Sequence, residues 1–198
     1  QDMNIIEKPE PEDTPFYINN GTINVGNTNG KVILQTFSLE SLVRVAEVFQ
    51  GKVPMCFLLW KGTGATDLTY DDPLGYASFI NLGVKYKAHF IGPCIAGAPN
   101  DYPELDQPWQ DYLIHRAKMK NHPYTFDTYD QMAKYFGQYN FGVADGMFNP
   151  PYLDALFTNH SDMSINYMIT HGWRKSPASQ TLVDAREVLR KLGYLDNN

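Results

Sequence analysis

Histidine, tyrosine and threonine lie close together in "NHPYTFDT", residues 121–128, between two stretches with helical patterns. The stretch could be a connecting loop or a buried strand whose end carries a functional site. Tyr124 and Phe126 occupy alternate positions, and Pro123 is tolerated near the start of a strand. We therefore expect residues 122–126 to form a strand.

The other groups that could do chemistry are scattered along the chain. His89 follows the pattern of a core histidine on a strand, and His115 is predicted to be exposed on a helix. No histidine pair has the spacing of a motif such as HExxH, and no GxSxG turn is present. Cys56 and Cys94 lack CxxC spacing, so two buried free thiols are favoured over one disulfide.

The elements that must position these groups alternate between short apolar runs and helical patterns. This rhythm is typical of βα units around a parallel sheet, so the predicted fold class is α/β. The expected strands are 31–37, 53–60, 87–95, 122–126 and 142–148, with a further one in 3–8. The expected helices are 38–49, 72–83, 106–120 and 128–139, one beginning near Pro151 and an amphipathic one at 181–194.

Capping residues mark several helix ends. Ser38 can cap the first helix, and Asp72 followed by Pro73 begins the second, which Gly83 is expected to end. Thr128 and Gln131 form a capping box at the start of the fourth. The third helix is predicted to bury an apolar stripe made of Trp109, Tyr112, Leu113 and Ala117.

Composition excludes several classes of function. The formal charge of -6 and the lack of a basic run with interleaved aromatics argue against nucleic acid. The longest apolar runs are too short for a membrane span, which needs ~20 residues. Because the sequence starts at Gln1, a leader removed earlier is compatible with it, and we expect a secreted or periplasmic protein rather than a cytoplasmic one.

Four stretches in this order, "VILQTFSLESL", "FIGP", "HPYTFDTYDQM" and "VADGMF", resemble the carboxyl-terminal half of the glycerophosphodiester phosphodiesterase family. The resemblance covers about residues 31–150. It implies a TIM-type (β/α) barrel, here incomplete at the amino terminus, over residues 1–157. Residues 158–198 would form a carboxyl-terminal extension with one amphipathic helix.

The resemblance also implies a chemistry: a divalent cation, Ca²⁺ or Mg²⁺, held by carboxylates, and hydrolysis of a glycerophosphodiester to glycerol 3-phosphate and an alcohol. The family's HRG motif, its Glu-X-Asp pair and the following His-Asp have no match here. Glu7, followed directly by Lys8, is the best candidate for the third metal carboxylate, with Glu10 and Glu12 as alternatives. A solvated acidic run is the competing interpretation.

Substrate-side residues carry over from the resemblance more directly. Tyr124 matches an aromatic residue that the family places beside the glycerol moiety. His122 matches a His-Pro pair of the family, for which we give a structural role as the first interpretation. Phe37 matches an aromatic at a strand mouth, with Gln35 on the same side by alternation. Lys61 follows a predicted strand, and Asp101 and Tyr102 lie in the loop after "FIGP", so these side chains could meet a substrate at the strand ends. The family's Thr-Asp after "DG" is replaced here by "NPPY".

The sequence and the resemblance support two main hypotheses about function. The first is a metal-dependent glycerophosphodiester phosphodiesterase, present as the carboxyl-terminal part of the domain and completed by an amino-terminal segment or chain. The alternative is a catalytically inactive binding module for a glycerol- or sugar-like ligand. A different α/β hydrolase using a lone Ser or Cys is the weakest hypothesis.

Overall fold

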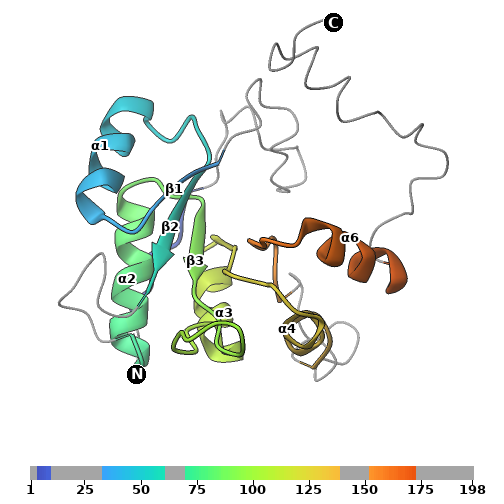
Figure 1. Cartoon of the computed structure of the whole chain (residues 1–198). Coiled ribbons are helices and arrows are strands. Elements are labelled where there is room, and N and C mark those ends of the chain that lie inside the picture. Colours follow the sequence, from blue (N-terminus) through green and yellow to red (C-terminus); the bar gives the residue numbers. More distant parts are fainter. Residues whose placement is uncertain (1–3, 10–32, 61–69, 139–151, 173–198) are drawn as a thin grey trace, which may run out of the picture. The chain divides into compact units, whose positions relative to one another are not determined.

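A computed structural model describes residues 4–9, 33–60, 70–138 and 152–172 of the chain (Figure 1). The predicted strand at 142–148 and the predicted helix at 181–194 lie outside the described residues. The chain divides into two units, Gln1–Ser164 and Ile165–Asn198. The sequence suggested a division after residue 157.

Four parallel strands form the sheet of the first unit. They are β1 (Leu34–Thr36), β2 (Met55–Leu59), β3 (Phe90–Pro93) and β4 (Lys120–Asn121), in the spatial order β1-β2-β3-β4 (Figure 1). Each strand therefore pairs with the next one along the chain. The α/β class with a parallel sheet is confirmed.

The helices begin where the capping residues predicted. Ser38 accepts a hydrogen bond from Ser41 N at the start of α1, and Asp72 accepts from two backbone amides at the start of α2. Thr128 and Gln131 form the predicted capping box. The helices are α1 (Leu39–Phe49), α2 (Pro73–Lys85), α3 (Pro108–Arg116), α4 (Tyr129–Met132) with the π-helical turn η2 (Ala133–Gln138), and α6 (Ser161–Thr170).

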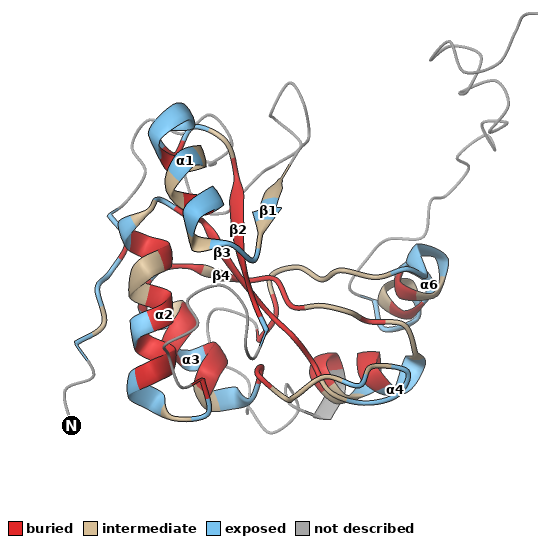
Figure 2. Ribbon diagram, turned by 60° about the vertical axis from the view of Figure 1, so that its left-hand side comes forward, coloured by how far each residue is buried: buried red, intermediate tan, exposed pale blue. Residues whose placement is uncertain are grey.

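Helices α1, α2 and α3 pack against the same face of the sheet (Figure 2). One cluster of buried side chains joins alternate residues of β2, such as Phe57, to residues of all three helices, among them Leu42, Phe79 and Ile114. Phe57 stacks on Phe79 with ring centroids 4.3 Å apart. The connections between successive strands thus all return over one face, rather than over both as in a doubly wound sheet.

A separate, smaller cluster lies on the opposite face. It contains Cys56, Leu58 and Phe90, with Ile33, Tyr124 and Phe157 packed against it. Both cysteines are free and buried, as predicted.

Gly92 lies where this second face is most tightly packed. A Cβ at Gly92 would lie 2.6 Å from Leu58 Cδ2, 2.8 Å from Cys56 Sγ and 3.1 Å from the His122 carbonyl oxygen. Neighbouring strands approach too closely here for any side chain.

We expect Gly92→Ala to lower the free energy of unfolding by about 1–3 kcal/mol through overpacking. Urea denaturation measures the loss. Gly83→Ala is the matched control, because its Cβ would meet the flexible ends of Ile91 and Met119 at 3.0 and 3.3 Å and alanine favours a helix. Equal losses in the two variants would contradict the tight packing at Gly92.

Several predicted elements and boundaries are wrong. The helix predicted at 106–120 ends at Arg116, and Lys120 belongs to β4. Helix α2 continues past Gly83 to Lys85, and Gly83 packs close to the side chains of Ile91 and Met119 instead of ending the helix. Residues 4–9 contain no strand; their backbone is bonded to Asn81 and to the Ala117 carbonyl. Residues 152–160 are not helical, and the helix starts at Ser161.

The predicted strand at 122–126 also needs correction. Strand β4 is the preceding pair Lys120–Asn121, and beyond it only Tyr124 forms an isolated bridge, with Cys94. Pro123 has no amide hydrogen to donate, so regular pairing cannot continue through it. The chain nevertheless stays beside β3, since Tyr124 N donates to the Pro93 carbonyl and Ile95 N to the Tyr124 carbonyl.

Candidate functional site

A cleft of about 250 Å³ lies on the sheet face that the three helices leave free, toward the carboxyl ends of the strands. Ligands of parallel α/β proteins bind at this edge. Five of its lining residues come from the strands or the chain that follows them, and three come from a distant segment. The lining residues are Gln35, Phe37, Leu58, Tyr124, Thr125, Phe157, Thr158 and Asn159.

Three of the residues proposed from the sequence therefore meet in one place. Gln35, Phe37 and Tyr124 line the same cleft. Phe37 and Tyr124 are in edge contact, with ring centroids 5.7 Å apart. Phe37 and Gln35 remain exposed, so both are accessible to a ligand.

Tyr124 is held from two sides. Its hydroxyl donates a 3.0 Å hydrogen bond to the Leu59 carbonyl at the end of β2. Burial raises the pKa of this phenol well above its ordinary value, so the hydroxyl stays a donor at physiological pH. The hydrogen bond and the ring contacts fix the orientation of Tyr124 beside the cleft.

Aromatic residues continue along the carboxyl edge of the sheet. Tyr102 contacts Tyr124 with centroids 5.9 Å apart and Trp60 with centroids 6.2 Å apart. Together with Phe37, the row contains one ring from the end of each of the four strands or the loop after it. Trp60 is 41% exposed. The sequence pointed to Tyr102 as a residue that could meet a substrate, but Trp60 was not predicted, although it ends the apolar run "FLLW".

The far wall of the cleft is formed by Phe157, Thr158 and Asn159, which sequence reasoning missed. Phe157 N donates to the Pro123 carbonyl at 2.9 Å, and Phe126 N donates to the Phe157 carbonyl at 2.8 Å. These residues thus run beside the extension of β4, where a next strand would lie. No regular pattern in the preceding sequence marked these residues as part of a site.

The structure does not bring Glu7 to the cleft. Glu7 is 61% exposed and forms a 3.2 Å ion pair with Lys118, which lies just before β4, at the opposite edge of the sheet. Lys61, Glu10 and Glu12 lie outside the described residues. Asp101 is exposed and does not line the cleft.

Neither of the strand histidines lines the cleft. His122 is packed between Phe90 and Phe157, with centroids 5.5 and 4.0 Å away, and burial lowers its pKa to about 4. His89 accepts a hydrogen bond from Met55 N, and burial lowers its pKa to about 3. Both are neutral at physiological pH. The core role predicted for His89 is confirmed.

Comparison with protein-family models and with curated proteins gave no match for this chain.

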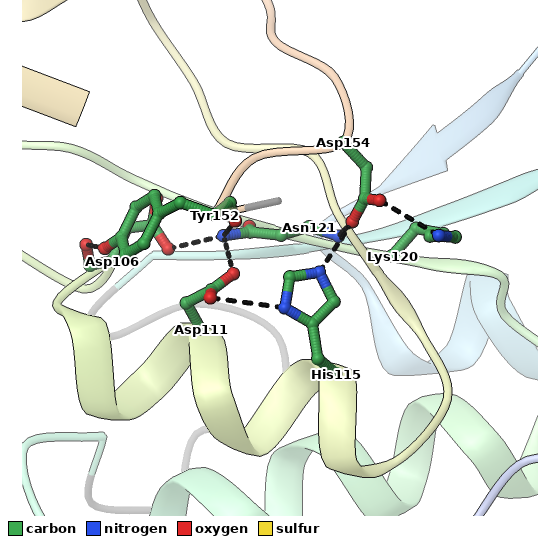
Figure 3. A network of polar contacts seen from close by, with 7 residues as sticks. All are labelled: Asp106, Asp111, His115, Lys120, Asn121, Tyr152 and Asp154. Carbon is green, nitrogen blue, oxygen red and sulfur yellow. Dashed lines mark hydrogen bonds and ion pairs between the residues drawn. The ribbon is translucent and has the colours of Figure 1, made fainter. Parts of the chain in front are cut away.

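His115 belongs to a buried polar network instead of the exposed face predicted for it (Figure 3). Its side chain is 10% exposed, with Nδ1 3.2 Å from Asp111 and Nε2 2.8 Å from Asp154. Lys120 Nζ lies 3.0 Å from the other oxygen of Asp154. The predicted apolar stripe of α3 is confirmed at Leu113 and Ala117 but wrong at Tyr112, which is exposed while Asp111 is buried.

The charges of this network follow from its geometry. Burial alone would lower the pKa of His115, but hydrogen bonds to Asp111 and Asp154 raise it to about 9. Burial would raise the pKa of Asp154, but the bond to His115 and the charge of Lys120 lower it. Asp111 is the less acidic of the two carboxyl groups that contact His115, because burial raises its pKa. At physiological pH, His115 is therefore an imidazolium and Asp154 is a carboxylate.

A second buried acid completes the network. Asn121 Nδ2 donates to Asp106 at 2.8 Å and to Asp111 at 2.9 Å. Asp106 is fully buried, and burial raises its pKa well above the ordinary value. Tyr152 donates its hydroxyl to the Asp106 carbonyl. The network joins α3, β4 and the start of the segment that forms the far wall of the cleft.

The cleft itself offers apolar rings, two side-chain amides and the hydroxyls of two threonines and one tyrosine. Aromatic faces pack against the carbon skeleton of a small polar ligand, whereas amides and hydroxyls bond its oxygens. Its lining contains no ionisable side chain except the tyrosine. Within the described ranges no group of His, Cys, Asp or Glu side chains could hold a metal ion.

Proposed function

We propose that this chain is the carboxyl-terminal part of a glycerophosphodiester phosphodiesterase-like barrel, and that the cleft binds the glycerol moiety of a glycerophosphodiester. The observation that carries the proposal is the meeting of Gln35, Phe37 and Tyr124 in one cleft. These residues were selected from the family resemblance, at separate positions in the chain.

The sheet supports the barrel part of the proposal. Strands in sequential order with helices on one face are the arrangement of a (β/α) barrel. A closed barrel has eight strands. The strands that close it would come from residues beyond the described ranges, from an amino-terminal segment, or from another chain.

Phe157, Thr158 and Asn159 add to this support. The family has hydrophobic residues followed by Thr-Asp after its last strand, and Leu156 to Asn159 repeat that order with an amide in place of the carboxylate. They line the same cleft as the residues chosen from the resemblance. We infer that an insertion after "DG" displaces the motif along the sequence but leaves it at the substrate.

A divalent cation, Ca²⁺ or Mg²⁺, is part of the expected chemistry of such a family. The described residues do not fit it, since the cleft lining carries no carboxylate and Glu7 pairs with Lys118 at the other edge. Such a cation would need carboxylates from outside the described residues. Hydrolysis by this chain depends on that contribution.

The uncharged lining favours a second candidate, a catalytically inactive module that binds a glycerol- or sugar-like ligand. Such a module would use the same rings and amides. Binding should then be independent of added cation, and the ligand should remain intact.

Calorimetric titration with glycerophosphocholine, with Ca²⁺ or with EDTA, tests the proposal. We expect saturable binding that Thr158→Trp abolishes, because the larger ring fills the cleft. Ser78→Trp is the matched control, since it adds the same ring to the exposed face of α2.

Phosphorus NMR of the same samples distinguishes the two candidates. Release of glycerol 3-phosphate only with Ca²⁺ supports the phosphodiesterase, and binding without release supports the inactive module. Lack of binding under both conditions would refute the proposed role of the cleft.

Among the residues that the structure describes, no helix has the length and apolar character needed to cross a bilayer.

A further inference from the structure

The segment at residues 154–159 is attached at its first end by one carboxylate. Asp154 accepts hydrogen bonds from Lys120 Nζ at 3.0 Å and from Asn121 N at 2.8 Å, and it pairs with His115 Nε2 at 2.8 Å. The backbone is also bonded, since Asp154 N donates to the Asn121 carbonyl at 3.1 Å. Helix α3 and strand β4 therefore both hold this end.

The second end is attached by another carboxylate. Asp127 accepts from Asn159 N at 2.9 Å and from Asn159 Nδ2 at 3.0 Å. Between the two ends, the bonds of Phe157 to residues 123 and 126 are the backbone contacts described above. The three residues that form the far wall of the cleft thus lie in a short span fixed at both ends.

We propose that Asp154, His115 and Lys120 form a clamp that positions residues 157–159 and thereby sets the width of the cleft. These are positioning residues, because none of them lines the cleft. The effect of the clamp on affinity rests on the proposed binding function, whereas its effect on the segment does not.

The charge of His115 controls the clamp. The charged groups that face it are Asp111 on its own helix and Asp154 on the segment, with Lys120 beyond Asp154 and Asp106 nearby. The pKa of His115 is raised to about 9, so its attraction for Asp154 is lost as the pH rises through about 9. Loss of that proton leaves two carboxylates on one neutral ring, with Lys120 as the remaining cation against Asp154.

Amide hydrogen exchange of the full chain tests the clamp without any ligand. In Asp154→Ala, protection of the Ala155 and Phe157 amides should fall by at least about tenfold, because the segment opens locally. Protection of the Cys94 amide, which bonds to Leu59 across β2 and β3, should be unchanged. Glu40→Ala is the control, since it removes an acid from an ion pair whose side chains are each 74% exposed.

Asp127→Ala tests the other end of the segment, where it removes only the two hydrogen bonds from Asn159. Protection of the Phe157 amide should fall in this variant too. Equal loss of protection throughout the sheet in both variants, or unchanged protection at Ala155 and Phe157, would overturn the proposal.

In a binding titration, affinity for glycerophosphocholine should fall between pH 7 and 10 in the wild type and be independent of pH in His115→Gln. If the wild type binds no glycerophosphocholine, only the proposed function fails, and exchange decides the clamp.

Discussion

Replacement of His115 by alanine is expected to lower the free energy of unfolding by about 3–5 kcal/mol at pH 7, the usual cost of removing one partner from a buried ion pair. Asp111 and Asp154 have side chains only 2% and 10% exposed. Without the imidazolium, both carboxylates stay buried with fewer compensating groups. Lys120 still neutralises part of the charge of Asp154, whereas Asp111 keeps only neutral partners such as Asn121.

Urea denaturation at pH 7 measures this loss, with Arg44→Ala as the matched control. Arg44 and Glu40 form an ion pair with the same spacing along a helix, but their side chains are 74% exposed. Such surface pairs contribute about 0–1 kcal/mol. A loss in His115→Ala no greater than that in Arg44→Ala would show that the buried network does not stabilise the fold.

The pH dependence of the difference gives an independent check. The pKa of His115 is raised from 6.5 to about 9 on folding, so its stabilising charge is fully present below 6.5 and is lost as the pH rises through 9. The pKa of Asp154 is lowered, so its contribution is fully present above 3.8 and is lost as the pH falls from there through the lowered pKa of the folded state. The difference between wild type and His115→Ala should therefore be largest at about pH 4–6 and shrink above pH 9.

The strands and helices that were predicted correctly are those set by local patterns. Five consecutive buried residues make β2, and the capping residues Ser38, Asp72 and Thr128 each fix a helix start through neighbours a few positions away. Such signals need only a short window of sequence. The parallel sheet followed from their alternation.

The polar network could not be predicted in this way. Periodicity marked Tyr112 for burial on α3, whereas the structure buries Asp111, which contacts His115 on the same helix and accepts a hydrogen bond from Asn121 in β4. The second carboxylate on His115 is 39 positions away in sequence. A helix face is assigned from its own residues, and a buried ion pair depends on residues that the helix does not contain.

Three of the eight residues that line the cleft were proposed from the sequence, for a similar reason. Gln35, Phe37 and Tyr124 lie at strand ends, and the family resemblance was enough to select them. Phe157 and Thr158 follow a long connection that carries no regular pattern, so their return to β4 depends on tertiary contacts such as those of Asp154. Glu7 was chosen from a motif alone, and the backbone bonds of residues 6 and 8 hold it at the other edge.

Tyr124→Ala is expected to weaken binding of glycerophosphocholine by about 30–100-fold, the effect of removing a central aromatic contact. The ring of Tyr124 lines the cleft beside Phe37, and it is held there by contacts with Phe37 and Tyr102 and by the hydrogen bond from its hydroxyl to the Leu59 carbonyl. Alanine would remove the surface that we propose for the carbon skeleton of a glycerol moiety. It would also free Phe37 to move.

Tyr124→Phe separates these contributions. Phenylalanine keeps the ring and loses only the hydrogen bond to Leu59, which is worth about 1 kcal/mol, so affinity should fall by no more than about sixfold. Calorimetric titration of both variants gives the two affinities, and circular dichroism checks that each is folded. Wild-type affinity in a folded Tyr124→Ala protein would exclude the cleft as the binding site, because a ligand that contacts the Tyr124 ring must bind more weakly when the ring is removed.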